Sequence, residues 1–306
     1  MLDFRIQTFL TLCETLSYTK TAALLHITQP TVTQHIQFLE GEYGCKLFCY
    51  SRKSLSLTER GELLRSCALG LRAGSERAAR LLRAPRAEGR RLRFGATLSI
   101  GEYVMPALLE RYLALHPQDE VQMTVQNTQN LLHALEHGEI SFAFIEGNFS
   151  RQDFASFVLS EEEFVPLCAG DSPLARHPVP FGALVGERLI LRERGSGTRE
   201  VLETILSEHN LPLTSFPARC ELGSFGPIKR LVAAGLGITF AYREVAAKEL
   251  QSGELAVIPI ERFAAGREFS FVCLQNDIFM EDFLAFFRFC KKERQWQAAA
   301  PYSRKD

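Results

Sequence analysis

The sequence predicts an α/β protein with two parts: a small, mainly helical N-terminal module and a larger C-terminal part. Residues 17–41 have the apolar spacing of two short helices joined by a tight turn. From residue 91 onward, apolar strand-like runs alternate with helical patterns, which is typical of a parallel α/β sheet. A chain of 306 residues also favours about two domains.

The N-terminal module begins with a helix expected over residues 3–16. Ser17 or Thr19 can cap the next helix, because a hydroxyl satisfies a free backbone N–H at a helix start. Thr28 is a natural N-cap for the third helix. Pro30 falls in its first turn, where the missing N–H costs nothing. The sequence therefore predicts a helix-turn-helix.

The third helix has an apolar stripe and a polar outer face. Val32, Ile36 and Leu39 follow helical spacing and should face inward. The outward hydroxyls and amides are suited to base edges in the DNA major groove, although an ordinary helical hairpin could present the same surface. The predicted DNA contacts of this segment are Thr28, Gln29, Pro30, Thr31, Thr33, Gln34 and Gln37.

A short wing should follow the hairpin. Residues 54–57 alternate polar and apolar side chains, the period of a strand. Arg52 and Lys53 stand just before it, where their charges could contact phosphates or the minor groove. The alternative is a solvated turn.

A longer helix should start after Thr58, run to about Ala84 and end at Pro85. One apolar stripe follows it, made of Leu64, Cys67, Ala68, Leu71, Ala78, Leu81 and Leu82. An exposed stripe needs a partner surface, and a two-fold dimer lets the stripe bury itself.

Composition and charge are those of an ordinary globular protein with an uneven charge distribution. The chain is 46% hydrophobic and 23% charged. Residues 1–90 hold 13 Lys and Arg against 8 Asp and Glu, and the remainder holds 22 against 28. A basic first part fits nucleic-acid binding. With no secretory signal and no apolar run long enough for a bilayer, we expect a cytoplasmic protein.

The eight cysteines do not form a metal-binding pattern with two halves. Cys45 and Cys49 make a lone C-x3-C, a weak metal signal, and the others are scattered. In a cytoplasmic chain they are expected to be reduced. We predict no metal and no cofactor.

Residues 1–61 resemble the winged helix-turn-helix of LysR-type transcriptional regulators. The segments FLTLCETLSYTKTAALLHITQPTVTQHIQFLEGEYGCKLF and LSLTERG carry this resemblance. The family implies a linker helix, a dimer or tetramer, double-stranded DNA as partner, and a two-lobed effector domain like a type-2 periplasmic binding protein. Its members commonly have Arg where this chain has Gln34 and Gln37, so this recognition helix is less cationic than usual.

The resemblance divides the chain into a DNA-binding domain (1–61), a linker helix (58–89) and an effector domain (90–306). Lobe I is expected at about 90–164 and 267–294, and lobe II at about 165–266. The cleft between two such lobes is a usual place for a small ligand.

The residues that match the family's effector site lie at helix starts and strand ends. They are Thr97, Ser99, Thr128, Gln129, Glu146, Gly147, Ser196, Gly197, Thr198, Arg199, Ser224 and Phe225. Helix N-termini flanked by hydroxyls favour anions, so we expect a small, anionic effector. Each Ser or Thr alone could be only an N-cap. Glu146 argues against an anion unless it orients Arg199 or a donor on the ligand.

Two other functions remain open. A solute-binding protein without DNA activity would have the same lobes but no use for residues 1–61. His133, Glu136 and His137 match the H-x-x-E-H pattern of some zinc hydrolases, although a solvated helix face gives the same pattern. No nucleophile elbow and no dinucleotide fingerprint are present. We therefore predict a ligand-responsive transcriptional regulator that is not an enzyme and has no catalytic residues.

Overall fold

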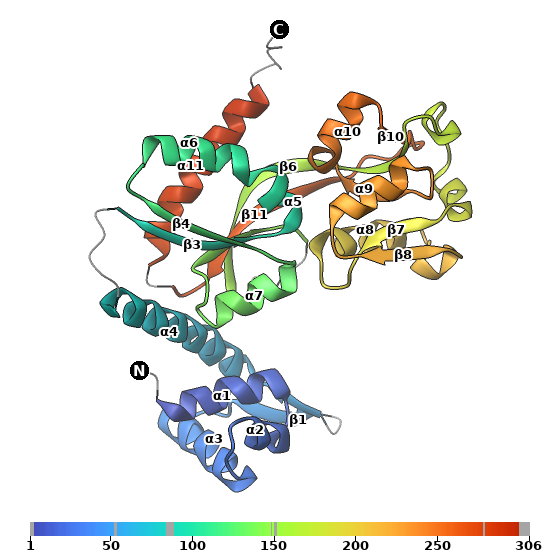
Figure 1. Cartoon of the computed structure of the whole chain (residues 1–306). Helices are drawn as coiled ribbons and strands as arrows, with labels where there is room; N and C mark the ends of the chain where they lie inside the picture. The colour runs from blue at the N-terminus through green and yellow to red at the C-terminus, as the bar shows by residue number, and fades with distance from the viewer. Residues whose placement is uncertain are drawn as a thin grey trace.

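The computed structural model describes residues 3–51, 54–83, 89–147, 149, 152–277 and 279–299. It consists of a small N-terminal module, one long helix, and two lobes joined by two long strands (Figure 1). Arg52 and Lys53, the predicted wing tip, lie outside the described residues.

The N-terminal module has the predicted helix-turn-helix and wing. Its elements are α1 (Phe4–Thr15), α2 (Tyr18–Leu24), α3 (Gln29–Tyr43), β1 (Phe48–Ser51) and β2 (Ser54–Leu57). Ser17 caps α2 by accepting a hydrogen bond from Lys20 N, and Thr28 caps α3 by accepting one from Thr31 N. The expected apolar stripe of α3, Val32, Ile36 and Leu39, is buried, which confirms the predicted inward face.

Helix α4 (Glu59–Arg83) continues from the wing. The Thr58 hydroxyl accepts a 3.0 Å hydrogen bond from Gly61 N, so the predicted cap is present. The expected stop at Pro85 falls in residues 84–88, outside the described residues. None of the described helices, α4 included, is long and apolar enough to cross a membrane.

Lobe I is an α/β layer structure. It contains β3 (Arg91–Ala96), α5 (Leu98–Tyr103), α6 (Met105–Leu115), β4 (Glu120–Val125), α7 (Thr128–Glu136), β5 (Phe142–Ile145), β11 (Gly266–Leu274) and α11 (Met280–Ala299). Strand β3 pairs in parallel with β4 and β5, whereas β11 returns antiparallel to β5. The sheet is therefore mixed. Strand β11 comes back from lobe II near the end of the chain and is not joined to β5 by a β–α–β crossover, so it can pair antiparallel.

The two faces of this sheet are covered by different helices. Phe142 and Phe144 point to one face, where aromatic side chains of α11 such as Phe286 pack against them. Ala143 and Ile145 alternate to the other face and share a buried cluster with Leu131 of α7. Both faces of β5 are thus buried, which explains why FAFI reads as a continuous apolar run.

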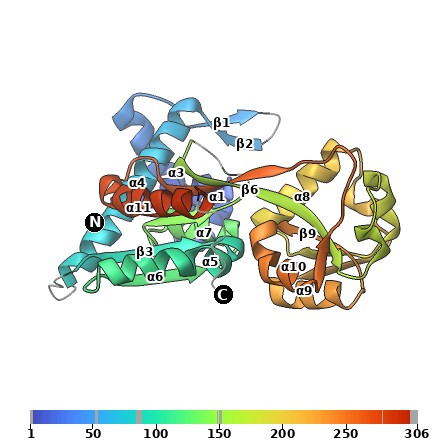
Figure 2. The same ribbon diagram turned by 90° about the horizontal axis from the view of Figure 1, so that it is seen from above.

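Lobe II is connected to lobe I by the strands β6 (Phe154–Ala169) and β11, which run side by side between the lobes (Figure 2). Its remaining elements are β7 (Leu189–Arg192), α8 (Gly197–Glu208), β8 (Arg219–Leu222), α9 (Phe225–Ala233), β9 (Thr239–Tyr242), α10 (Ala247–Ser252) and β10 (Leu255–Val257), with short 3-10 turns η1 (Pro173–Ala175), η2 (Phe181–Gly186), η3 (Leu213–Ser215) and η4 (Arg243–Ala246). Strands β9 and β10 pair antiparallel with β6, and β7 pairs in parallel with β8.

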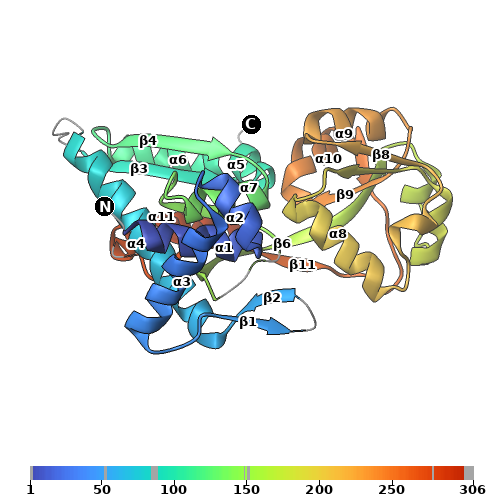
Figure 3. The same cartoon turned by 90° about the horizontal axis from the view of Figure 1, so that it is seen from below.

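The apolar stripe of α4 is divided between two environments. Ala68, with the neighbouring Leu69 and Ala73, is buried in the cluster that also contains the lobe I side chains, so part of α4 packs against its own chain. In Figures 1 and 3 the N-terminal module and α4 lie beneath lobe I, not beneath lobe II. Leu71 and Leu82 remain 62% and 83% exposed.

Candidate functional site

The predicted effector residues of lobe I gather at the ends of its strands. Thr97 follows β3, Thr128 begins α7, and Glu146 follows β5. Thr97 N donates a 3.0 Å hydrogen bond to Phe144 O, which holds the end of β3 beside the end of β5. The carboxyl ends of parallel strands meet at one edge of a sheet, and this edge faces lobe II.

The Glu146 carboxylate is the centre of this site. Its Oε2 accepts a hydrogen bond from the Thr97 hydroxyl, and its Oε1 accepts one from Ser99 at 3.0 Å. Thr198, at the start of α8 in lobe II, donates to the same Oε1 at 3.2 Å. Glu146 is only 2% exposed. One buried carboxylate therefore receives hydroxyl donors from both lobes.

The protonation of Glu146 is set by opposing effects. Burial raises its pKa, while the three hydroxyl donors and the positive charge of Arg192 act in the opposite direction. The net shift is upward, so the site binds a proton more readily than an exposed glutamate does. The Tyr242 hydroxyl is also buried and has no hydrogen-bond partner among the described residues. Burial, followed by the charge of Glu146, raises the pKa of Tyr242.

The two lobes also touch around Gly197. Gly197 N donates a 3.1 Å hydrogen bond to the Thr128 hydroxyl, which itself donates to Glu146 O at 3.0 Å. A Cβ atom at position 197 would lie 2.2 Å from the Glu146 carbonyl oxygen, so only glycine permits this approach. Gly147, at φ +93°, faces Gly197 across the same contact. The cleft is closed in this structure.

The other predicted effector residues lie around this centre in different ways. Ser196 caps α8 by accepting a hydrogen bond from Arg199 N at 3.1 Å. The Arg199 guanidinium is turned into lobe II, where it bonds to Glu203, Glu221 and Arg192 O. The structure thus directs the Arg199 charge away from the Glu146 carboxylate.

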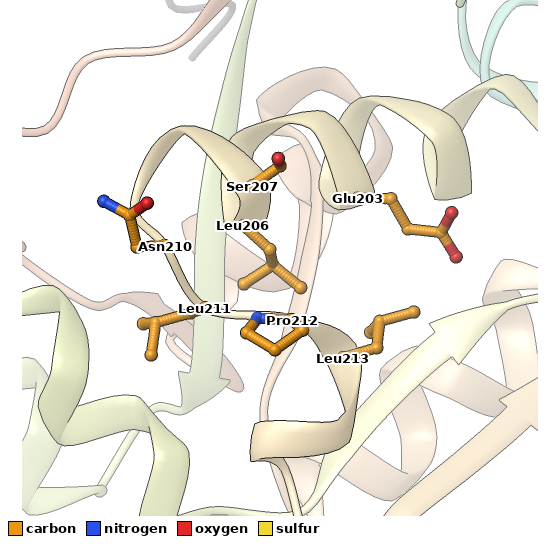
Figure 4. Close-up of a pocket in the computed structure, with 7 residues that line it drawn as sticks. All are labelled: Glu203, Leu206, Ser207, Asn210, Leu211, Pro212 and Leu213. Atoms are coloured by element: carbon orange, nitrogen blue, oxygen red, sulfur yellow. The ribbon is translucent and has the colours of Figure 1, made fainter.

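Gln129, Ser224 and Phe225 are not hydrogen-bonded to the carboxylate either. Gln129 is exposed and lines a pocket of 680 Å³ together with Arg194 and Arg199. A second pocket of 510 Å³ lies between α8 and the segment after it, with Leu206, Leu211 and Leu213 among its lining (Figure 4). Neither pocket is lined by Glu146. Ser224 makes no side-chain cap bond, and the buried Phe225 ring lies 6.1 Å from the Tyr103 ring of lobe I.

Sequence reasoning missed Arg192, Tyr242 and Lys229. Arg192 ends a strand that is otherwise apolar, and its guanidinium lies 4.8 Å from the Phe225 ring. Lys229 of α9 lies 4.8 Å from the Tyr103 ring and so bridges the lobes. The sequence signal for Arg192 was a charged residue directly after the apolar run of residues 189–191, where burial of the charge would need a specific partner. No local pattern distinguishes Lys229.

The predicted DNA-binding face is formed by α3. Gln29, Pro30, Gln34 and Gln37 are exposed, Thr31 and Thr33 are half-buried, and Thr28 is an exposed cap. Gln29 Nε2 donates a 3.2 Å hydrogen bond to the Thr33 hydroxyl, which holds the amide along the helix surface. The face is polar and uncharged, as the sequence indicates.

The H-x-x-E-H segment does not form a metal site. The His133 and His137 rings stack with centroids 4.0 Å apart, and Glu136 Oε1 accepts a 3.1 Å hydrogen bond from Arg65. Among the residues that the structure describes, no three His, Cys, Asp or Glu side chains could hold a metal ion together. This geometry does not favour the hydrolase alternative, because Glu136, which would be its general base, is hydrogen-bonded to Arg65.

Comparison with protein families gives two matches that together span most of the chain. Residues 5–62 match the model described as a bacterial regulatory helix-turn-helix protein of the lysR family. Residues 85–295 match the model described as a LysR substrate binding domain.

Two relatives are similar in sequence over most of their length. The uncharacterized HTH-type transcriptional regulator YeiE of Escherichia coli (strain K12) is 34% identical over 256 residues, 84% of this chain and 85% of the relative. CysL of Bacillus subtilis is 29% identical over 271 residues, 87% of this chain and 89% of the relative.

Two solved structures are similar in fold. Oxidized OxyR of Corynebacterium glutamicum covers 97% of this chain and 92% of its own with a TM-score of 0.56 at 22% identity. The CcmR regulatory domain of Synechocystis PCC6803, solved in complex with 2-PG, covers 66% of this chain and 97% of its own with a TM-score of 0.59 at 26% identity.

Proposed function

The chain belongs to the LysR family of bacterial transcriptional regulators, and from this premise we propose that the cleft around Glu146 binds a small anionic effector which controls DNA binding. The effector would meet the hydroxyls of Thr97, Ser99 and Thr198. These are the groups that now donate to the Glu146 carboxylate.

The observation that carries this proposal is the convergence of three buried hydroxyl donors from two lobes on one negative group. A hydrogen bond from a hydroxyl is stronger when its acceptor is charged, and a low-dielectric site strengthens the bond further. The same donors suit the oxygens of an oxyanion or a carboxylate. The 2-PG complex of the CcmR domain supports a small ligand in a domain of this kind.

Glu146 narrows the class of effector. Two neighbouring anions in a buried site repel each other unless a proton lies between them. Burial raises the pKa of Glu146, so the site can hold this proton on the protein. The effector would therefore be one of two kinds. It could be an anion that accepts hydrogen bonds from the hydroxyls and from protonated Glu146. It could also be a ligand with its own hydrogen-bond donor, which would bind ionised Glu146. Binding of a pure anion would therefore be coupled to the protonated form of Glu146, and its affinity should increase as pH falls.

The DNA-binding unit would act as a pair. Two α3 helices of a dimer would enter successive major grooves of a pseudo-palindromic site, about 34–36 Å apart. The exposed Leu71 and Leu82 of α4 offer apolar surface for the dimer. Contacts between effector domains would join dimers into a tetramer. This role needs access to the chromosome, so we also propose that the protein is cytoplasmic. We further propose that it has no catalytic activity.

Two measurements on the full chain test the proposal. The first is a gel shift with duplexes selected from a random-sequence library, which should give a specific complex whose affinity falls with rising salt. The second is a thermal-shift screen with inorganic oxyanions, small carboxylates, amines and neutral compounds. We expect stabilisation by members of the two anionic classes. Stabilisation by amines or neutral compounds alone would contradict the anionic effector, and absence of specific DNA binding would contradict the regulator.

A further inference from the structure

Arg65 of α4 binds two carboxylates of lobe I at the same time. Its Nη1 donates to Asp153 Oδ2 at 2.5 Å, and its Nη2 donates to Glu136 Oε1 at 3.1 Å. The Arg65 side chain is 21% exposed, and the side chains of Asp153 and Glu136 are 5% and 18% exposed. The two terminal nitrogens of one planar guanidinium thus bridge two carboxylates, an arrangement that the single ammonium nitrogen of a lysine does not reproduce.

The first carboxylate belongs to a segment that begins in the cleft. Strand β5 ends at Ile145, Glu146 follows it, and the chain then reaches Asp153 seven residues after Glu146. The Asp153 carbonyl accepts a 2.8 Å hydrogen bond from Gln275 N, which fixes the far end of the segment to the end of β11. Asp153 is therefore near the cleft carboxylate in the sequence.

The second carboxylate belongs to a helix that also begins in the cleft. Thr128, the first residue of α7, contacts both Glu146 O and Gly197 N, and Glu136 is the last residue of the same helix. A helix of this length spans roughly 12 Å from end to end at 1.5 Å per residue. A shift of the α7 N-terminus on opening of the cleft would thus move its C-terminus at Arg65.

Arg65 is held by charge as well as by geometry. Burial by itself lowers the pKa of Arg65, but the charge of Asp153 and its hydrogen bond outweigh burial and raise it. Burial likewise raises the pKa of Glu136, against the attraction of Arg65. Asp153 Oδ1 is buried with no partner among the described residues, so a rearranged Arg65 has an acceptor available. Loss of one member of a partly buried pair leaves the other uncompensated.

On the other side, α4 is continuous with the DNA-binding module. Ala68 and Leu69 of α4 share one buried cluster with Phe9 of α1, Leu39 of α3 and Leu131 of α7. Arg72, seven residues after Arg65, lies 3.9 Å from Glu14 of α1 and donates to Glu136 O at 2.9 Å. A movement of α4 against lobe I would therefore carry the DNA-binding module with it.

We propose that Arg65 is a positioning residue that couples the effector cleft to the DNA-binding module, because it binds Glu136 at the far end of α7, whose near end lies in the cleft, and also binds Asp153 of lobe I. A change at Glu146 would reach Arg65 through α7, whose first residue contacts Glu146 O and whose last residue binds the guanidinium. The guanidinium would then set the placement of α4. The coupling acts within one chain and does not require the second protomer.

Hydrogen exchange of the α4 amides in the full chain without DNA tests this coupling. Glu146→Gln serves as the change in the cleft. In the otherwise unchanged chain we expect it to alter α4 exchange rates on the order of fivefold or more. In chains that also carry Arg65→Gln the effect should disappear, and with Arg65→Lys it should be only partly restored. Asp153→Asn, which keeps the side-chain shape, should reduce it as well.

Arg77→Gln is the matched control. Arg77 also joins α4 to lobe I, by a 3.1 Å hydrogen bond to the Ser141 hydroxyl before β5, but this contact is with a neutral group and involves neither Asp153 nor Glu136. With Arg77→Gln the effect of Glu146→Gln should persist. Equal effects of Glu146→Gln with and without Arg65, or no effect on α4 in the unchanged chain, would overturn the proposal. Since no DNA or effector is used, this result is independent of the proposed function.

Discussion

The Thr198 hydroxyl in lobe II donates a 3.2 Å hydrogen bond to the Glu146 carboxylate in lobe I. This contact and the Gly197–Thr128 hydrogen bond hold the cleft closed around a negative group of the protein itself. An incoming anion must therefore share or replace that group. The predictions about the cleft follow from this relationship.

Thr198→Val should retain operator binding and lose much of the effector response. Valine matches the shape of threonine but cannot donate to Glu146 or to a ligand oxygen. Loss of a hydrogen bond to a charged group weakens binding by about tenfold. The affinity should be measured by calorimetry with whichever oxyanion or carboxylate stabilises the unchanged chain most. An unaltered affinity would remove Thr198 from the effector site.

Glu146→Gln should flatten the dependence of stability on pH. Because the pKa of Glu146 is raised above its ordinary value of 4.5, the folded chain keeps a proton that the unfolded chain has lost. The free energy of unfolding therefore falls as pH rises from 4.5 toward the raised pKa, and this loss is absent below 4.5. Glutamine does not titrate, so the variant lacks this loss.

The measurement is the melting temperature of both proteins between about pH 5 and about pH 8, a range that lies above the ordinary pKa of glutamate. Glu136 and Asp277, whose pKa values are also raised, chiefly by burial, are present in both proteins. The difference between the two curves therefore isolates Glu146. Parallel curves would show that Glu146 does not titrate in this range.

Gln29→Ala should weaken specific DNA binding more than non-specific binding. Gln29 is exposed at the start of α3, and its amide can pair with the edge of one base. We expect a loss of roughly 1–3 kcal/mol on the preferred duplex and little change on a scrambled duplex. Fluorescence anisotropy with both duplexes at one salt concentration measures this difference. Equal losses on both would show that Gln29 does not read sequence.

Leu71→Glu should reduce self-association without unfolding the chain. Leu71 is 62% exposed on α4, so a charge there would be buried only in a dimer. Sedimentation should show a shift toward monomer, while circular dichroism stays unchanged. Leu236→Glu, at a 47% exposed leucine in a turn of lobe II, is the matched control and should not change the assembly. Dimers of unaltered affinity would place the interface elsewhere.

Local sequence patterns determined much of this protein. The caps at Ser17, Thr28 and Thr58 were predictable, since a hydroxyl acts on an N–H two or three residues away. The buried face of α3 and the continuous apolar run of β5 were predictable from spacing alone. The gathering of Thr97, Thr128 and Glu146 also followed, because the carboxyl ends of parallel strands share one edge.

Only the tertiary structure decided which partners these residues meet. The three hydroxyls are satisfied by Glu146 before any ligand arrives, and Arg199 is turned away into lobe II. Arg65 finds Asp153 at a sequence separation of 88 residues, and α4 buries part of its stripe on its own lobe I. The physical reason is that spacing fixes the face on which a side chain lies, whereas packing of distant segments fixes what that face contacts.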